Sequence, residues 1–117
     1  MRYSSSHEWV RVEGNLATVG ISSYAQSQIG EIVYVELPAV GRHLSCGDGA
    51  VVLESTKAAA DVYTPLSGKV VAINQNLDMD RLNTAPETEG WLFQLEMMDP
   101  AELDDLMDHA TYCLKCR

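Results

Sequence analysis

The sequence is poor in positive charge and in cysteine, and it has no long hydrophobic run. Its 117 residues include 8 Lys and Arg against 17 Asp and Glu, for a net charge of −9. Nucleic-acid binding depends on clustered Lys and Arg, so we expect no nucleic-acid partner. No apolar stretch approaches the roughly 18 residues that a membrane span needs. The segment Met1–Ser6 lacks the hydrophobic core of a signal peptide. We therefore expect a cytoplasmic protein with no membrane partner.

Three cysteines are too few, and odd in number, for a disulfide framework. Cys113 and Cys116 have the spacing of a redox or metal motif. A thioredoxin-type site needs such a pair at a helix N-terminus, and a zinc site needs further ligands, for which His109 is the one candidate nearby. We expect reduced thiols and no metal site. Dithiol redox catalysis through this pair is the alternative, and it would make the protein an enzyme.

Length and turn residues indicate a single domain, residues 1–117, of mainly β structure. Short apolar runs are separated by glycine and proline, and no strand–helix–strand rhythm is present, so a parallel nucleotide-binding sheet is not expected. Gly49-Ala50-Val51-Val52 is echoed by Gly68-Lys69-Val70-Val71. This echo suggests a small β sandwich built from two related halves.

The expected elements follow from periodicity and caps. Asp99, with Pro100 at the first helical position, predicts a C-terminal helix whose apolar stripe is Leu103, Leu106, Met107 and Ala110. Clean alternation predicts a half-buried strand over Glu31–Leu37. The other expected elements are a hairpin of Glu8–Arg11 with Leu16–Ile21, a short helix over Tyr24–Ile29 with a capping box from Ser23, and strands at Ala50–Leu53, Val62–Thr64, Val70–Ile73 and Trp91–Leu95.

Lys57 lies between two of these strand-like runs, where a tight connection must carry its side chain into water. A solvated turn lysine is the simplest interpretation. A lysine that acts as base or Schiff-base former needs burial or a cationic neighbour. The nearest charges, Glu54 and Asp61, favour the protonated amine instead. Covalent attachment of a prosthetic group remains, because Ala58-Ala59-Ala60 leaves the amine accessible to a modifying enzyme.

The residues around Lys57 resemble a known pattern. Glu54-Ser55-Thr56-Lys57-Ala58, followed by Asp61-Val62-Tyr63 and Pro65-x-x-Gly68-x-Val70, is similar to the lipoyl-lysine hairpin of glycine cleavage system H proteins. The resemblance extends in the family's order from about Ser6 to about Tyr112. It includes His7-Glu8-Trp9-Val10, Ala17-Thr18-Val19-Gly20-Ile21, Tyr24-Ala25-Gln26, Val35-Glu36-Leu37-Pro38, Gly90-Trp91-Leu92 and Asp99-Pro100-Ala101-Glu102-Leu103.

The resemblance implies a barrel-sandwich hybrid of the lipoyl- and biotinyl-carrier type, with short flanking helices that include a C-terminal one. It implies lipoic acid joined by an amide to Lys57, on a monomeric carrier subunit that is not itself an enzyme. The carrier would shuttle the aminomethyl intermediate of glycine between a pyridoxal-phosphate glycine decarboxylase, a folate-dependent aminomethyltransferase and a flavin-containing dihydrolipoyl dehydrogenase, and lipoyl-attachment enzymes would modify it. By the same resemblance, the loaded arm would rest in a cleft that involves Glu8, Asp61 and Thr64.

Some residues depart from the family pattern. Thr56 stands where the family usually has valine, the stretch from Asn83 to Glu89 is shorter than usual, and the cysteine-bearing tail is atypical. An H-like lipoyl donor for other enzymes is therefore an alternative function. A biotinyl carrier is a weaker alternative, since its lysine typically lies between methionines, whereas Thr56 and Ala58 flank Lys57. A purely structural β domain would carry no lysine modification.

Overall fold

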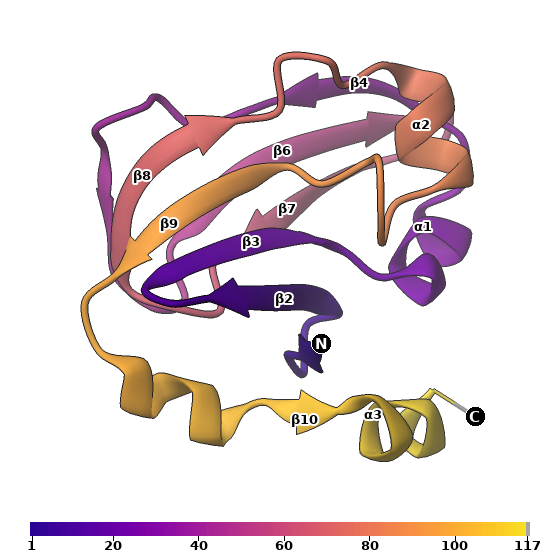
Figure 1. Ribbon diagram of the computed structural model, residues 1–117. Helices are drawn as coiled ribbons and strands as arrows, with labels where there is room; N and C mark the ends of the chain where they lie inside the picture. The colour runs from indigo at the N-terminus through magenta and orange to yellow at the C-terminus, as the bar shows by residue number, and fades with distance from the viewer. Residues whose placement is uncertain (117) are drawn as a thin grey trace.

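The computed structural model describes residues 1–116, which fold into two antiparallel sheets with short helices around them (Figure 1). The larger sheet has the strand order β10-β1-β2-β3-β9-β8-β5, and the smaller has the order β4-β6-β7. The larger sheet consists of β1 (Arg2–Tyr3), β2 (Glu8–Glu13), β3 (Leu16–Ile21), β5 (His43–Leu44), β8 (Gly68–Ile73), β9 (Phe93–Met97) and β10 (Met107–Asp108). The smaller sheet consists of β4 (Ile32–Glu36), β6 (Gly49–Ser55) and β7 (Ala59–Tyr63).

The helices are short. They are α1 (Ser23–Ile29), α2 (Met79–Thr84), the 3-10 helix η1 (Pro100–Asp105) and α3 (His109–Lys115). Among residues 1–116, no helix is both long and apolar enough to cross a membrane. The mainly β fold class with short flanking helices is confirmed. The two stretches of the internal echo begin β6 and β8, one in each sheet.

The hairpin of β2 and β3 forms as expected. Glu13 pairs with Leu16 across a two-residue turn, and Gly14 at its first position has φ of 61°. A positive φ at the first turn position is typical of the type II′ turns that match the twist of paired strands. The following helix is offset from its prediction by one residue. Ser22, not Ser23, is the N-cap of α1, because its hydroxyl accepts the hydrogen bond from Ala25 N at 3.1 Å.

The simple alternation expected over Glu31–Leu37 is wrong. Ile32 is buried, but Val33 and Tyr34 are both exposed, at 51% and 48%. A bulge between Ile32 and Tyr34 in the pairing of β4 with β6 is the cause. A β-bulge inserts one unpaired residue and so reverses which side chains face the core. Downstream of it, Val35 and Leu37 pack against the core. Strand β9 also differs, because it starts at Phe93, two residues later than expected.

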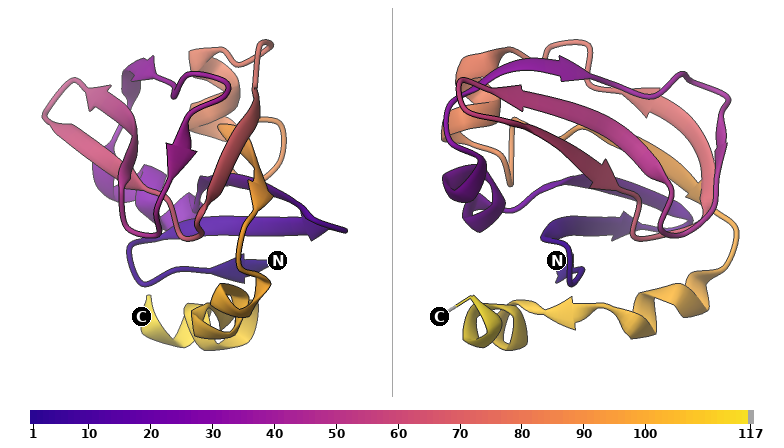
Figure 2. Two further views of the ribbon diagram at one scale, coloured as in Figure 1. Left: turned by 90° about the vertical axis from the view of Figure 1, so that its left-hand side faces the viewer. Right: turned by 180° about the vertical axis from the view of Figure 1, so that it is seen from behind.

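The continuous C-terminal helix expected after Asp99 is also wrong. Asp99 does cap a helical segment, since its carboxylate accepts from Ala101 N, but η1 ends at Asp105 and Leu106 is extended. Strand β10 then pairs with β1, and α3 begins only at His109. The views in Figures 1 and 2 agree that this tail runs along the edge of the larger sheet beside the N-terminus. Pairing with a strand at the opposite end of the chain overrides the helical stripe.

The core is divided into two clusters. The larger one lies between the sheets and includes Val19, Leu53, Leu66 and Phe93. The smaller one consists of Tyr3, Trp9 and Tyr112, with Cys116 and Trp91 packed against it. Trp9 is fully buried, and its indole N–H donates to Pro86 O at 2.8 Å. Its ring occupies the space where residue 20 would carry a side chain, because a Cβ at Gly20 would lie 2.7 Å from three ring atoms.

Gly20→Ala should therefore destabilise the fold by about 1–3 kcal/mol, since a buried ring cannot move away from the added methyl group. Urea denaturation measures the change. Gly49→Ala is the matched control, because Gly49 also lies in a strand and a Cβ added there would meet nothing within 4 Å. We expect less than roughly 0.5 kcal/mol of change for the control. Equal stability of the two variants would contradict this account of Gly20.

Candidate functional site

Lys57 lies in the connection between β6 and β7, as the sequence predicts, and its side chain is exposed. The two strands pair from Gly49↔Tyr63 to Glu54↔Ala59, so the connection spans few residues. Ser55 closes the turn. Its hydroxyl accepts from the backbone N–H groups of Lys57 at 3.2 Å and Ala58 at 3.1 Å, and its own N–H donates to Ala58 O at 2.8 Å. The lysine backbone is thus held while its side chain remains free.

The turn rests on the segment that follows α1. Thr56 N donates to Glu31 O at 3.4 Å, and Gly30 lies under the lysine side chain. A Cβ at Gly30 would lie 3.7 Å from both Cε and Nζ of Lys57, and Gly30 has φ of 89°. Glycine is required by that backbone conformation, and its lack of a side chain leaves the lysine stem unobstructed. In Figures 1 and 2, the ends of β6 and β7 that this turn joins lie at the same end of the fold as α1 and α2.

Asn83, on α2, fastens this segment to the rest of the fold. Its side-chain oxygen accepts from Ile32 N at 2.8 Å and Gln26 Nε2 at 3.1 Å, and its amide group donates to Ile32 O and Met79 O, each at 2.9 Å. One side chain therefore joins α1, α2 and β4 directly behind the Lys57 turn. Asn83 is not recognisable as a site residue from the sequence, because nothing local to α2 reveals its partners on β4.

Glu8 is buried at the start of β2, with 2% of its surface exposed. Ser4 and Ser6 each donate a hydroxyl to its Oε1 at 2.6 Å, and backbone groups of Tyr63 and of Glu8 itself add hydrogen bonds. Burial raises the pKa of Glu8, and these hydrogen bonds oppose the shift without cancelling it. The result is a buried carboxylate whose ionised form is costly to maintain and would be stabilised by a cation.

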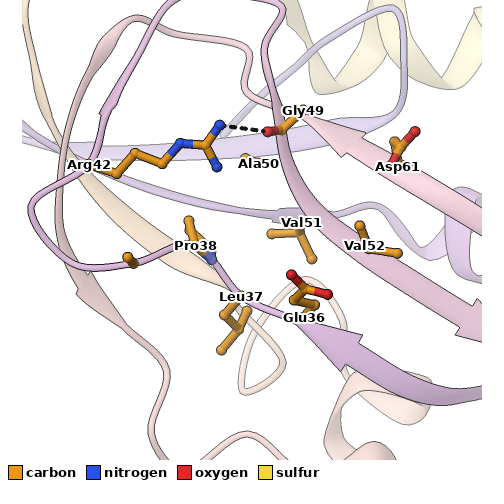
Figure 3. A pocket seen from close by; sticks show the side chains of 10 residues that line it. Glu36, Leu37, Pro38, Arg42, Gly49, Ala50, Val51, Val52 and Asp61 are labelled. Carbon is orange, nitrogen blue, oxygen red and sulfur yellow. Dashed lines mark hydrogen bonds between the residues drawn. The ribbon is translucent and has the colours of Figure 1, made fainter.

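The other two cleft residues implied by the resemblance do not share one cavity. Thr64 is buried, donates to Leu66 O at 2.6 Å and lines a groove of about 260 Å³ together with both serine partners of Glu8. Asp61 is exposed and lines a separate cavity of about 350 Å³. Figure 3 shows Asp61 from β7, Glu36 from β4 and Arg42 from the loop before β5 around that second cavity. The structure therefore brings Thr64 and the serine partners of Glu8 to one groove, leaves Glu8 itself buried behind them, and places Asp61 at another cavity.

A hydrogen-bond network next to Glu8 was not predicted from the sequence. Tyr112 OH lies 2.6 Å from Ser22 Oγ and 2.8 Å from His7 Nδ1, so α3 is tied to the cap of α1 and to the loop before β2. Tyr3 stacks on Tyr112 with ring centroids 4.3 Å apart. His7 is the one non-glycine residue with positive φ, 72°, among residues 1–116. Only the tertiary pairing of the two chain ends reveals this network.

Glu87 extends this hydrogen-bond network from Tyr3 to the start of α1. Its carboxylate accepts from Tyr3 OH at 2.6 Å and from Ser23 N at 2.8 Å. Burial alone would raise the pKa of Glu87, but these hydrogen bonds outweigh burial and hold the pKa below its usual value. Burial and the Glu87 carboxylate together raise the pKa of Tyr3. The N-terminus, α1 and the loop before β9 are therefore held together by an ionised carboxylate.

No group of three or more His, Cys, Asp or Glu side chains within the described residues could hold a metal ion. Cys113 and Cys116 lie in the last turn of α3, away from the helix N-terminus that a thioredoxin-type pair occupies. Cys46 is exposed in a turn, and its thiol donates to Pro65 O at 3.3 Å.

Comparison with known proteins gives consistent matches over nearly the whole chain. The family model described as Glycine cleavage H-protein matches residues 1–117. A glycine cleavage system H protein of Thermotoga maritima is 51% identical over 113 residues, which cover 95% of this chain and 91% of that protein. One from Parvibaculum lavamentivorans is 47% identical over 114 residues, with coverage of 96% and 91%. The crystal structure of a glycine cleavage system H protein from Mycobacterium marinum superimposes with a TM-score of 0.88 at 30% identity, and covers 97% of this chain and 94% of that one.

The raised pKa of Glu8 predicts how pH affects stability. A carboxyl group whose pKa is higher in the folded than in the unfolded state binds more protons when the protein is folded. Its contribution to stability is fully present below the ordinary pKa of 4.5, and it is lost as the pH rises through the pKa of the folded state. The wild-type protein should thus lose stability relative to Glu8→Gln as the pH rises above 4.5. Urea denaturation of both proteins from pH 4 to pH 8 measures the difference. A difference that stays constant across this range would contradict the assignment.

Proposed function

Because the chain belongs to the glycine cleavage H-protein family, we propose that it is a lipoyl-bearing carrier of the glycine cleavage system and that Lys57 is the attachment residue. The observation that carries this proposal is the position of Lys57, exposed at the end of the β6–β7 hairpin on a backbone that Ser55 and Glu31 hold in place. An attachment enzyme needs such an accessible amine on an ordered turn. The matched proteins favour neither a lipoyl donor for other enzymes nor a biotinyl carrier.

The exposed position of Lys57 indicates which part of the carrier's function the chain itself would supply. A lipoyl group on Lys57 would supply a dithiolane that carries an aminomethyl group, and the enzymes of the system would supply the remaining chemistry. The chain itself would contribute a rigid mount. Tethering raises the effective concentration of a reactive group at each partner, provided that its base does not move. Asn83 and the Gly30–Ile32 segment are the residues that we propose fix this base.

Membership of the glycine cleavage system implies its other enzymes as partners. We propose that these are the glycine decarboxylase, the aminomethyltransferase and the dihydrolipoyl dehydrogenase, together with the enzymes that attach lipoate. We also propose that the chain is a monomeric, non-catalytic subunit. These proposals rest on the family and on the exposed lysine, and they assign no reacting group to the chain other than the Lys57 amine.

We propose further that Glu8, with Thr64 at the adjoining groove, holds the amine of the cargo, and that Asp61 contributes from the separate cavity that it lines. A cargo amine is protonated near neutral pH, and a buried carboxylate gains most from such a cation. Glu8 already has the geometry for this role, because Ser4 and Ser6 fix its Oε1. Burial raises the pKa of Glu8 because the ionised carboxylate is poorly solvated there, and a docked ammonium group would reduce this free-energy cost.

Lys57→Arg should abolish lipoylation and leave the fold intact, because arginine retains length and charge but cannot form the amide. Intact mass and peptide mapping of protein from lipoate-replete cells measure the modification. Lys69→Arg is the matched control, since Lys69 is also exposed, on β8, and this variant should be lipoylated like the wild type. Wild-type protein that is unmodified, or modified at Lys69, would refute the assignment of Lys57.

Glu8→Gln and Asp61→Asn should both be lipoylated normally but should release ammonia faster once loaded. Loss of one charge-assisted hydrogen bond costs about 1.5–3 kcal/mol, which corresponds to roughly tenfold or more in the equilibrium between docked and free cargo. The measurement is the rate of ammonia release from the isolated loaded protein. Glu13→Gln, at the exposed end of β2, is the control and should match the wild type. Unchanged release in both test variants would show that neither carboxylate holds the cargo.

A further inference from the structure

Helix α3 carries two thiols, and each lies against a different imidazole. Cys113 Sγ is 3.6 Å from His109 Nε2 and 3.8 Å from His109 Nδ1, one helical turn earlier on the same face. Cys116 Sγ is 4.0 Å from His7 Nδ1, which comes from the loop before β2. Neither histidine nor either cysteine has a role in the proposed carrier function. Two thiols three residues apart, one of them in contact with an imidazole that could take its proton, are an arrangement suited to thiol–disulfide exchange.

The two thiols differ in accessibility, which distinguishes their roles. Cys113 is exposed, whereas Cys116 is half-buried and packs against the cluster of Tyr3, Trp9 and Tyr112. An attacking thiol must meet a reagent from solution, and a resolving thiol needs only to reach its neighbour. Cys113 therefore fits the first role and Cys116 the second.

The His7 ring is held in a fixed position beside Cys116. Its ring is fixed by the hydrogen bond to Tyr112 OH at 2.8 Å and lies 4.8 Å from the Tyr24 ring, centroid to centroid. Burial, and then the charge of Lys115, lower the pKa of His7, so the imidazole is neutral near neutral pH. The titratable groups around His109 are Tyr3, Glu87, Asp108 and Cys113.

The backbone permits a bond between the two sulfurs. Residues three apart on a helix have Cβ atoms about 5–6 Å apart, and a disulfide needs about 3.5–4.5 Å. Cys116 is the C-cap of α3, and its N–H makes the terminal helical hydrogen bond to Tyr112 O at 3.1 Å. Only this last turn has to tighten. The pair lies at the C-terminal end of the helix, where the helix dipole does not favour a thiolate, so the activation that a helix N-terminus supplies in thioredoxin-type sites has to come from His109.

We propose that Cys113 and Cys116 form a thiol–disulfide exchange site for small-molecule disulfides of the glutathione class, in which Cys113 attacks and Cys116 resolves. In the first step, His109 takes the proton of Cys113, and the thiolate displaces one thiolate from the disulfide to give a mixed disulfide at Cys113. In the second step, the thiolate released in the first step takes the proton of Cys116, whose own thiolate then attacks Cys113 Sγ and displaces the second thiolate. Both leaving thiolates take up the two protons. One disulfide is reduced to two thiols, and the two cysteines are oxidised by two electrons.

Cys46 provides an internal control, because it is the third free thiol of the same chain. Burial, followed by the nearby Glu102 and Asp105 carboxylates, raises the pKa of Cys46. Its thiol is engaged with Pro65 O, and no imidazole is within hydrogen-bond distance of it in the described residues. Cys46 should therefore react slowly although the residue is exposed.

The test is incubation of the full-length protein with oxidised glutathione at pH 7, followed by peptide mapping under non-reducing conditions. The wild type should end with a Cys113–Cys116 disulfide. Cys116→Ser should stop at a glutathione adduct on Cys113, and Cys113→Ser should react about tenfold more slowly. Cys46→Ser and Lys57→Arg should behave like the wild type. The Lys57→Arg result separates this proposal from the carrier function, since that variant has no lipoyl attachment residue.

His109→Gln tests the proton acceptor separately. It should slow formation of the adduct about tenfold at pH 7 and regain the wild-type rate at alkaline pH, where solvent deprotonates the thiol. Circular dichroism spectra of all variants should match that of the wild type. A glutathione adduct that accumulates in the wild type, or modification of Cys46 as fast as Cys113, would overturn the proposal. Equal rates for His109→Gln and wild type at pH 7 would overturn the role of His109.

Discussion

The antiparallel pairing of β6 with β7 is the constraint on which the proposed carrier site depends. It brings Glu54 opposite Ala59, so that Ser55 can close the connection with three backbone groups. The Lys57 side chain is exposed because the residue lies in the turn beyond the last paired residues of the two strands. A turn held only by its own hydrogen bonds would still move as a unit. The contact of Thr56 with Glu31, and the four hydrogen bonds of Asn83, fix the turn against α1 and α2.

A second set of contacts joins the chain ends to the same part of the fold. Pairing of β1 with β10 brings Tyr112 over Tyr3, and its hydroxyl then reaches Ser22 and His7. Since His7 precedes Glu8 directly, the tail helps to order the loop that buries the Glu8 carboxylate. The cysteine pair of α3 lies on this network. The proposed exchange site and the proposed cargo groove are therefore neighbours through His7, although they involve different side chains.

Sequence patterns correctly predicted the features that depend only on residues adjacent in the chain. The Gly14 turn, the short helix after Ile21 and the Asp99 cap each depend on a few adjacent residues, and each is present, with the α1 cap shifted by one residue. The errors arose where a distant partner decides the conformation. The bulge in β4 depends on its register with β6, and the interruption of the C-terminal helix depends on β1. Neither partner can be identified from periodicity within the segment itself.

The sequence by itself determined the β-rich fold class, the family and the placement of Lys57 in a tight connection, because hydrophobic period, turn residues and motif order are properties of the chain. Only the tertiary structure decided what surrounds that lysine and how the candidate cleft residues are distributed. Thr64 and the serine partners of Glu8 share a groove that Asp61 does not line, although Asp61 and Thr64 are close in sequence. The physical reason is that cavities and buried hydrogen bonds form between segments whose register is fixed by packing of the whole chain.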